Sequence, residues 1–362
     1  MKKVAVKLGI NGYEIRVGSG VMANAGPWLK ELGFTAKAVI ITDSNVGPLY
    51  AAALEQSLAG AGFKVTVVEV QAGEAQKTLE TAGALYQKLA AAYAERTTPV
   101  LALGGGVVGD LAGFIAATYL RGVPLVQVPT SLLAMVDSSV GGKTAVDHGQ
   151  LKNTVGAFYQ PKMVIADVAV LKTLPREELS NGLAEVIKMA ALKDKKFFAF
   201  LEANIEQATA LKPDVLEEII LKSTTLKAAI VARDERETGE RTLLNYGHTI
   251  GHAIEAVSGF RIKHGQAVAL GMIAANSIAV KLGMLPSAQA AKIESVIRRA
   301  GLSVAIPEFT GEERENILQA VRHDKKVLNG RIRFVLLKSI GSPVIKGDVE
   351  PGLIKEVLFG RG

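Results

Sequence analysis

Cysteine is absent from this chain of 362 residues, so neither a disulfide framework nor a thiolate metal site can form. Any tightly bound metal ion would need histidine, aspartate or glutamate ligands. No uncharged apolar run reaches about 18 residues, which argues against a transmembrane helix. The N-terminus also lacks the apolar stretch of a secretory signal. We therefore expect a cytoplasmic protein with no membrane partner.

Long basic runs are also missing, although 42 Lys and Arg against 35 Asp and Glu give a net charge of +7. The basic residues are scattered and are not interleaved with aromatics, so nucleic-acid binding is not expected. A solvated basic surface and a cleft that attracts small anions both fit this balance. With 49% hydrophobic residues and 37 glycines, the composition favours an α/β enzyme of about two domains.

The pattern of apolar residues along the chain changes near Pro175. Before it, β-rich runs at 37–43, 64–70 and 99–103 alternate with helical patterns at 50–58 and 79–92, which predicts a Rossmann-like parallel sheet with covering helices. After it, 3.6-residue periodicity dominates, at 177–192, 215–233, 249–257 and 268–282. We predict an α/β domain over residues 1–175 and a mostly α-helical domain over 176–362.

A glycine turn, GGGVVGD at 104–110, follows a predicted strand and precedes an apolar helical run. It fits G-x-G-x-x-G, where glycines let the backbone approach a pyrophosphate and the helix start supplies free amides. The stretch 124–130 lacks the carboxylate that would bind a ribose, and Asp43 at the end of an earlier strand is a candidate substitute. The plain structural alternative is that these glycines only close a tight turn.

Three of the five histidines lie within seventeen positions, at His248, His252 and His264. The first two are four residues apart on one helical face, a spacing that can bind zinc, but the peptidase motif His-Glu-x-x-His is absent. Glu185, in an otherwise apolar helix, is the candidate carboxylate ligand because a charge there needs a partner. Lys188 on the same face offers an alternative, an intrahelical ion pair. Spacing alone leaves open which histidines would coordinate.

Several cations could bind a phosphate or a carboxylate, although each lysine alone is more often a solvated surface residue. Lys143 follows two glycines in a hydroxyl-rich segment that resembles a P-loop only superficially, since Asp137 stands where the first Walker glycine belongs. ATP hydrolysis is therefore not expected. The other candidates for anion binding are Lys152 with Asn153, Lys188, Lys227, Arg241, and Lys325 with Lys326.

Four segments in order resemble the 3-dehydroquinate synthase family, within a match from about residue 39 to residue 341. They are GGGVVGD at 104–110, PTSLLAMVDSSVGGKT at 129–144, NGLAEVIK at 181–188 and NYGHTIGH at 245–252. Four such segments together are much more specific than any one of them.

The resemblance implies cofactors, NAD and Zn²⁺ (or Co²⁺), and assigns residues to each site. It implies metal ligands Glu185, His248 and His264. It implies an NAD site of Asp43, Glu74, Lys77, Gly105, Gly106, Asp110, Thr130, Ser131 and Thr173. It implies substrate contacts from Asp137, Lys143, Lys152, Asn153, Lys188, Lys227, Arg241, Asn245, His252 and Lys326, the last preferred over Lys325. Of these, Lys143, Lys188, Arg241, Asn245 and His252 are the implied catalytic residues.

The implied reaction converts 3-deoxy-D-arabino-heptulosonate 7-phosphate into 3-dehydroquinate and phosphate, the second step of the shikimate pathway. It runs through transient oxidation at C5, phosphate elimination, re-reduction and aldol closure, and the family suggests a homodimer. Three alternatives remain at this stage. They are a metal-dependent polyol dehydrogenase, a sister cyclase acting on glucose 6-phosphate, and an NAD-binding module without catalytic activity.

Overall fold

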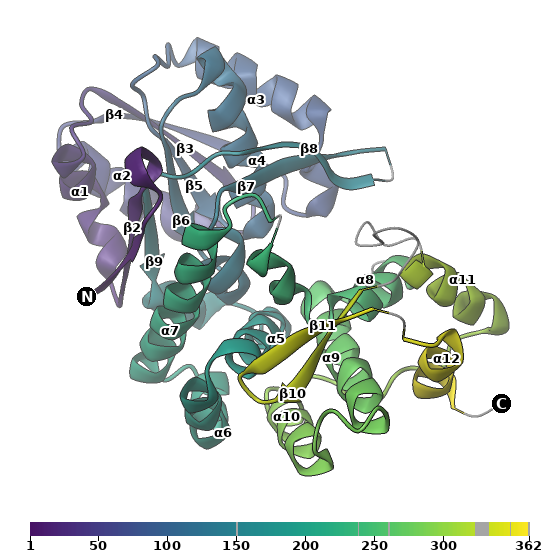
Figure 1. The fold of residues 1–362 in the computed structure, drawn as a ribbon. Helices are drawn as coiled ribbons and strands as arrows, with labels where there is room; N and C mark the ends of the chain where they lie inside the picture. Colours follow the sequence, from purple (N-terminus) through teal and green to yellow (C-terminus); the bar gives the residue numbers. More distant parts are fainter. Residues whose placement is uncertain (150, 238, 260, 323–332, 348, 361–362) are drawn as a thin grey trace. The chain divides into compact units, whose positions relative to one another are not determined.

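The computed structural model describes residues 1–149, 151–237, 239–259, 261–322, 333–347 and 349–360 (Figure 1). The chain forms two compact units. The first contains residues 1–174 and 216–236, and the second contains residues 175–215 and 237–362. The sequence analysis predicted a single domain boundary near residue 175. The observed division differs, because residues 216–236 belong to the first unit and not to the mostly helical second unit.

Helix α7 (Pro213–Arg233) carries most of this returning segment. Its acidic residues bind the N-terminal region: Glu218 accepts from Lys2 Nζ at 2.9 Å, and Glu217 accepts from the Ser19 amide at 3.1 Å. The 3.6-residue periodicity at 215–233 correctly predicted this helix. It could not predict which unit the helix would pack in. That choice depends on contacts between residues about 200 positions apart in the sequence.

The first unit is built on a seven-stranded sheet in the order β1-β2-β9-β6-β5-β3-β4. Six strands are parallel and β1 pairs antiparallel with β2. The strands are β1 (Lys2–Val6), β2 (Tyr13–Gly18), β3 (Lys37–Asp43), β4 (Lys64–Val70), β5 (Val100–Gly104), β6 (Leu125–Pro129) and β9 (Met163–Asp167). The predicted Rossmann-like parallel sheet is confirmed, with β3 and β4 at the predicted bounds.

Helices cover both faces of this sheet because the strands are apolar on both sides. In β3, Ala38 and Ile40 pack in one core with the first helix pair, while Val39 and Ile41 pack in a second core with the other pair. The first pair is α1 (Ala25–Glu31) and α2 (Gly47–Gly60), and the second is α3 (Leu79–Ala91) and α4 (Gly106–Thr118) (Figure 1). Alternation along one strand thus places its side chains in two separate cores.

The order of the strands indicates where a ligand would bind in the first unit. From β3 the chain crosses to β4 on one side and then returns to β5 on the other side of β3. In open α/β sheets, ligands bind at the carboxyl ends of the strands where the strand order reverses in this way. The ends of β3 and β5, at Asp43 and Gly104, flank that point.

Between β6 and β9 the chain forms a turn and a hairpin. Residues Ala134–Ser138 form one π-helical turn, a feature often found at functional sites. Strands β7 (Lys143–His148) and β8 (Leu151–Phe158) then pair antiparallel. Lys143 is the first residue of β7 and pairs with Phe158 of β8.

The second unit is mostly helical, as predicted. Its helices are α5 (Arg176–Lys193), α6 (Lys195–Thr209), α8 (His248–Val257), α9 (His264–Lys281), α10 (Ser287–Arg299), α11 (Gly311–Arg322) and α12 (Pro351–Phe359). Helix α9 is buried along most of its length and is the centre of the unit. Among the described helices, none is both long and apolar enough to cross a bilayer.

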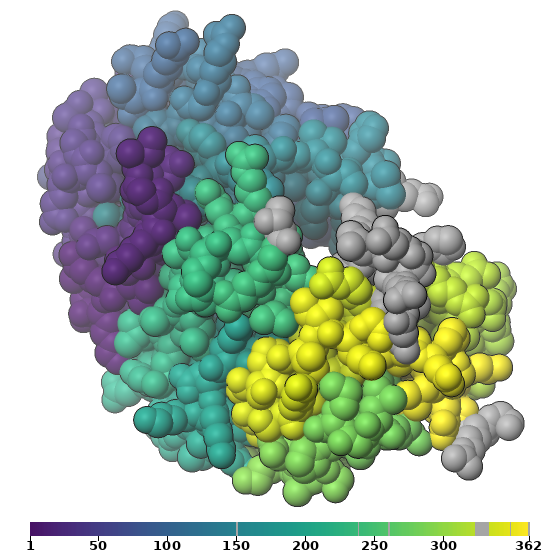
Figure 2. Space-filling model, viewed as in Figure 1, coloured from purple at the N-terminus to yellow at the C-terminus, as the bar shows by residue number. Residues whose placement is uncertain are grey.

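A β-hairpin in the second unit was not anticipated from the sequence. Strands β10 (Phe334–Ser339) and β11 (Ser342–Lys346) pack on α9 and α5 and form part of the surface seen in Figure 2. The buried run from Phe334 to Leu337 has no clear alternation of polar and apolar residues. Such a short apolar run cannot be distinguished from a buried helical segment by periodicity.

Candidate metal and nucleotide sites

Three helices of the second unit bring Glu185, His248 and His264 together. Glu185 lies in the middle of α5 and is 2% exposed, while each histidine begins its helix. The Nε2 atoms of His248 and His264 lie 3.6 and 3.5 Å from Glu185 Oε1. One ligand atom from each of the three lies within 4.8 Å of the others.

Close backbone packing makes this convergence possible. A Cβ on Gly271 in α9 would lie 1.8 Å from the carbonyl oxygen of Gly247, and one on Gly265 would lie 2.4 Å from the backbone of Asn181 in α5. Gly247 itself has φ of +79°, which favours glycine. Any side chain at 265 or 271 would force the helices apart and separate the ligand groups.

Both imidazoles are oriented through Nδ1. The Nδ1 atom of His248 lies 3.2 Å from the carbonyl oxygen of Tyr246, and that of His264 lies 3.2 Å from Glu255 Oε2. Since each Nδ1 faces an acceptor, Nε2 is the nitrogen of each ring directed at Glu185. Burial opposes the charge on His264, but Glu185 and Glu255 outweigh it and raise its pKa to about 10.

The donor set fits a divalent metal ion. Two imidazoles and one carboxylate are typical of catalytic zinc sites, which keep a fourth position open. Metal–ligand bonds of about 2.1 Å in tetrahedral geometry place ligand atoms about 3.4 Å apart, close to the 3.5 and 3.6 Å found here. The residues therefore match the chemistry and the spacing that such an ion requires.

Glu185 also forms an ion pair with Lys188, three residues later on α5. Both side chains are almost completely buried, at 2% and 3% exposed. The two sequence interpretations, metal ligand and intrahelical ion pair, are therefore compatible, because one carboxylate takes part in both arrangements. A buried lysine that lost its carboxylate would be strongly destabilising.

His252 lies one helical turn after His248 in α8. Its ring centroid is 5.0 Å from that of His248 and 5.8 Å from that of His264. It is exposed, and it forms a second group of possible ligands with Glu255 and His264. Its position beside the first group agrees with a role next to a metal ion, although spacing in the sequence could not separate these roles.

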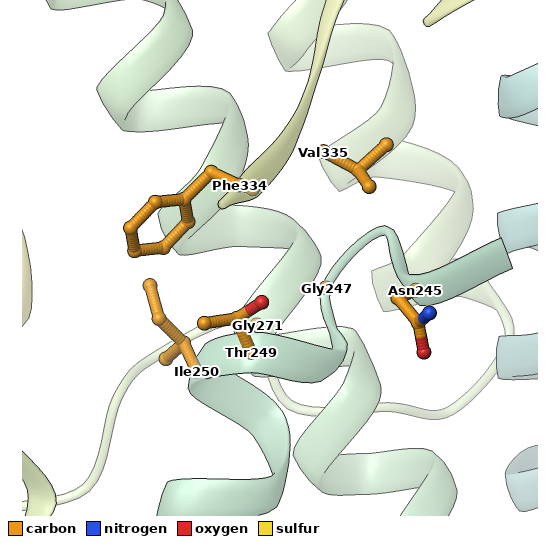
Figure 3. A pocket seen from close by; sticks show the side chains of 8 residues that line it. Asn245, Gly247, Thr249, Ile250, Gly271, Phe334 and Val335 are labelled. Carbon is orange, nitrogen blue, oxygen red and sulfur yellow. The ribbon is translucent and has the colours of Figure 1, made fainter. Parts of the chain in front are cut away.

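The segment before α8 holds two further candidates. Arg241 is 3% exposed, and the Asn245 side-chain amide donates to Thr242 O at 3.1 Å and to Glu237 Oε1 at 3.2 Å. Figure 3 shows Asn245 at one end of a crevice, with Phe334 and Ile250 at the other. The crevice itself leaves no room for a water molecule.

In the first unit, most of the predicted nucleotide residues lie just beyond the carboxyl ends of the strands. Asp43 Oδ1 accepts from the amides of Asn45 and Val46 at 2.9 and 3.0 Å, which fixes the turn into α2. Gly105 and Gly106 join β5 to α4, and a Cβ on Gly106 would crowd Ser138 Oγ at 3.3 Å. Thr130 and Ser131 follow the end of β6, and Thr173 ends the short 3-10 helix Val168–Thr173 that follows β9.

A second predicted group surrounds Lys77, which is 3% exposed. Its Nζ donates to Asp110 Oδ2 at 2.6 Å and to the side chain of Asn153. Burial raises the pKa of Asp110, and the Lys77 ammonium acts against that rise. Glu74 pairs with Lys152 at 3.4 Å. Residues predicted for the cofactor and residues predicted for the substrate are thus directly bonded to one another.

Lys227 on α7 also contacts a predicted partner. Its Nζ donates to both the carbonyl oxygen and Oδ1 of Asp137 at 2.5 Å. The structure therefore joins these two predicted substrate residues within the first unit. Lys326, the remaining predicted contact, lies outside the described residues.

The sequence reasoning missed Glu255 and the glycines between helices. Glu255 follows His252 by three residues and His248 by seven, so all three share one face of α8. That periodicity was a detectable signal. The contacts of Gly265 and Gly271 are between separate helices and left no such signal.

Comparison with known proteins gives consistent matches. Residues 67–181 match the family model described as 3-dehydroquinate synthase N-terminal, and residues 182–327 match 3-dehydroquinate synthase C-terminal. A protein of Desulforamulus reducens named 3-dehydroquinate synthase is 47% identical over 359 residues, covering 99% of both chains.

Solved structures extend the comparison to the fold. A 2-deoxy-scyllo-inosose synthase complexed with carbaglucose-6-phosphate, NAD⁺ and Co²⁺ superposes with a TM-score of 0.90 at 28% identity, covering 99% of both chains. A 2-epi-5-epi-valiolone synthase from Streptomyces hygroscopicus with NAD⁺ and Zn²⁺ bound has a TM-score of 0.88 at 28% identity, covering 99% of this chain and 98% of that chain.

Proposed function

Because the chain belongs to the 3-dehydroquinate synthase family, we propose that it converts 3-deoxy-D-arabino-heptulosonate 7-phosphate into 3-dehydroquinate and phosphate. In this proposal it is a phosphate-eliminating carbon–oxygen lyase that serves aromatic amino-acid biosynthesis. The observation that carries the proposal is the convergence of Glu185, His248 and His264, a group that could hold a metal ion, in a chain 47% identical to a named synthase.

NAD and Zn²⁺, or Co²⁺ in its place, are the proposed cofactors. The two solved relatives carry NAD⁺ with one or other of these ions. When bound, NAD accepts and returns a hydride, and the metal acts as a Lewis acid toward substrate hydroxyl groups. The other contributions come from the side chains of the protein.

Residues of the first unit are proposed to hold the nucleotide and the anionic groups. The turn at Gly105 and Gly106 would let the pyrophosphate approach the start of α4, whose free amides and dipole favour an anion. Lys143, Lys152 and Lys227 would neutralise the phosphate and carboxylate of the substrate. Lys227 is now bonded to Asp137, so substrate binding would require this cation to change or share its partner.

Residues of the second unit are proposed to hold the substrate and move protons. His252 is the candidate proton relay because it is exposed and stands one turn from a metal ligand. Arg241 would bind an anionic group, Asn245 would position a hydroxyl, and Lys188 would lie beside the metal-bound end of the substrate. We further propose a cytoplasmic homodimer, as the family resemblance suggests.

A coupled assay tests the function. Purified protein is incubated with NAD⁺, Zn²⁺ and the heptulosonate phosphate, and phosphate release and NADH absorbance are recorded together. Phosphate release that requires both cofactors, without net NADH, is the expected result because the reaction is redox-neutral overall. Steady NADH formation from glycerol without phosphate release would instead establish a polyol dehydrogenase.

Two controls separate the remaining alternatives. Glucose 6-phosphate in place of the heptulosonate phosphate should release no phosphate, and release from it alone would identify a sister cyclase. Tight NAD⁺ binding with no turnover of either sugar phosphate would identify a binding module without catalytic activity.

A further inference from the structure

The carboxylate of Glu255 contacts a proposed metal ligand from the side opposite Glu185. Glu255 lies on α8 with a side chain 14% exposed, and its Oε2 is 3.2 Å from His264 Nδ1. The other ring nitrogen, Nε2, is 3.5 Å from Glu185 Oε1. One imidazole is therefore held between two carboxylates, each facing a different nitrogen.

We propose that Glu255 is a positioning residue, which holds His264 with Nδ1 protonated and Nε2 directed at the metal position. The inference rests on the proposed metal site. A histidine ligand that donates its second N–H to a carboxylate has a fixed tautomer, a fixed ring orientation and a more basic coordinating nitrogen. Rotation of the ring by half a turn would break the contact to Glu255 and turn a carbon toward Glu185.

Nδ1 of the other proposed histidine ligand, His248, faces a different kind of group. Comparing the two histidines shows what Glu255 contributes. His248 Nδ1 faces the carbonyl oxygen of Tyr246, a backbone group. A backbone acceptor cannot be removed by substitution and carries only a partial charge. Nδ1 of His264 instead faces a side chain, so substitution at one position can change the orientation of this proposed ligand.

Helix geometry explains why Glu255 can take this role. His248, His252 and Glu255 are spaced i, i+4 and i+7, which places all three on one face of α8. That face carries one proposed ligand, the proposed proton relay and the carboxylate that holds the other ligand. Changing Glu255 should therefore alter His264 without removing any of the three ligand atoms of the first group.

The test measures metal affinity and coordination directly, without turnover. Glu255→Ala and Glu255→Gln are compared with the unsubstituted protein in a zinc competition titration, and the visible absorption of the Co²⁺ form is recorded. We expect Glu255→Ala to weaken binding about 10- to 100-fold, the range found for such outer partners, and to shift the Co²⁺ spectrum. Glu255→Gln should lose less affinity, because its amide oxygen still accepts from Nδ1–H.

A matched control is available on another helix of the same unit. Glu294 on α10 pairs with Arg298 at 2.6 Å on the surface. Glu294→Ala therefore removes a carboxylate whose partner is an arginine and not a proposed metal ligand. It should leave both the zinc affinity and the Co²⁺ spectrum unchanged. Circular dichroism on all variants confirms that each remains folded.

Each outcome has one meaning. If the unsubstituted protein binds no metal, the proposed function fails and not only this inference. If it binds metal and Glu255→Ala binds equally well with the same Co²⁺ spectrum, the positioning role is wrong. Complete loss of binding, equal to that of His264→Ala, would make Glu255 a direct ligand within the group formed with His252 and His264.

Discussion

The candidate sites of the two units are constructed in different ways. In the second unit, side chains from three helices converge on one point and are fixed by glycine contacts between the helices. In the first unit, backbone ends of parallel strands provide the site, and lysines such as Lys77 and Lys227 are held by carboxylates. The proposed metal site is thus prearranged by packing, whereas cations of the proposed anion site would have to change or share existing ion-pair partners.

The largest expected effect is on the metal site. Glu185→Gln removes a proposed ligand and takes the Glu185 carboxylate from the buried Lys188. Metal affinity should therefore fall by more than about 100-fold and the free energy of unfolding by about 3–5 kcal/mol. Metal analysis and urea unfolding measure the two effects. The double variant Glu185→Gln/Lys188→Met should regain stability without regaining metal, and recovery of metal would exclude Glu185 as a ligand.

Helix packing gives the next effect. Gly271→Ala places a methyl group 1.8 Å from a backbone oxygen, and overpacking of this kind costs about 1–3 kcal/mol or more. Metal affinity should fall with it because the helices separate. Gly83→Ala in α3 of the first unit is the matched control, since nothing lies within 4 Å of its Cβ position. It should stabilise by about 0.5–1 kcal/mol, and equal effects of both changes in urea unfolding would contradict this explanation.

A substitution in the first unit should change stability without changing zinc affinity. Lys77→Met leaves Asp110 without its ammonium partner, so the free energy of unfolding should fall by about 1–3 kcal/mol. Zinc affinity should stay the same, because the ligands belong to the other unit. Urea unfolding and zinc titration of the same sample test this pair of expectations, and a drop in zinc affinity would show that the two sites are energetically coupled.

Metal binding should depend on pH through His264. Its pKa of about 10 means that the metal-free ring is protonated near neutrality, and binding requires the neutral ring. Below pH 10, affinity should therefore rise about tenfold per pH unit from this proton alone. Without metal, the raised pKa stabilises the fold fully below the ordinary value of 6.5, and this contribution is lost as pH rises through about 10.

Calorimetry of zinc binding in buffers with different ionisation enthalpies counts the released protons. At least one proton per ion is expected at pH 8. Heat that is independent of the buffer would show that the ring is already neutral in the metal-free protein.

The smallest effect is expected at a surface pair. Arg299 binds both oxygens of Glu206 at 2.5 and 2.7 Å and lowers the pKa of that carboxyl to about 2. The stabilisation is present above the ordinary pKa of 4.5 and is lost as pH falls through about 2. Glu206→Gln should lower Tm slightly at pH 7, and the difference should close by pH 2. A difference that persists there would point to a packing effect.

Local patterns predicted much of both units. The bounds of β3 and β4 followed from periodicity, because these strands are apolar in a regular register. The predicted helical ranges correspond to α2, α3, α5, α7, α8 and α9, whereas α1, α6, α10, α11 and α12 were not predicted. The gathering of Glu185, His248 and His264 followed from residue chemistry and family resemblance. The glycine segment was correctly predicted to follow a strand, but α4 begins within it, at Gly106, and not after residue 110.

Features that depend on distant contacts could not be predicted in the same way. The β10–β11 hairpin has no alternating pattern, and the choice of unit for α7 depends on partners such as Lys2. The ion pairs of Lys77 and Lys227 join segments 33 and 90 residues apart. Such pairings are decided by the completed fold and leave no mark on neighbouring residues.

The return of residues 216–236 to the first unit has a consequence for dissecting the protein. The chain passes between the units at three places, after residues 174, 215 and 236. A gene fragment ending at residue 175 would encode the seven strands without α7, the helix that binds Lys2 and Asp137. A continuous fragment that contains the whole first unit must therefore also encode residues 175–215 of the second unit.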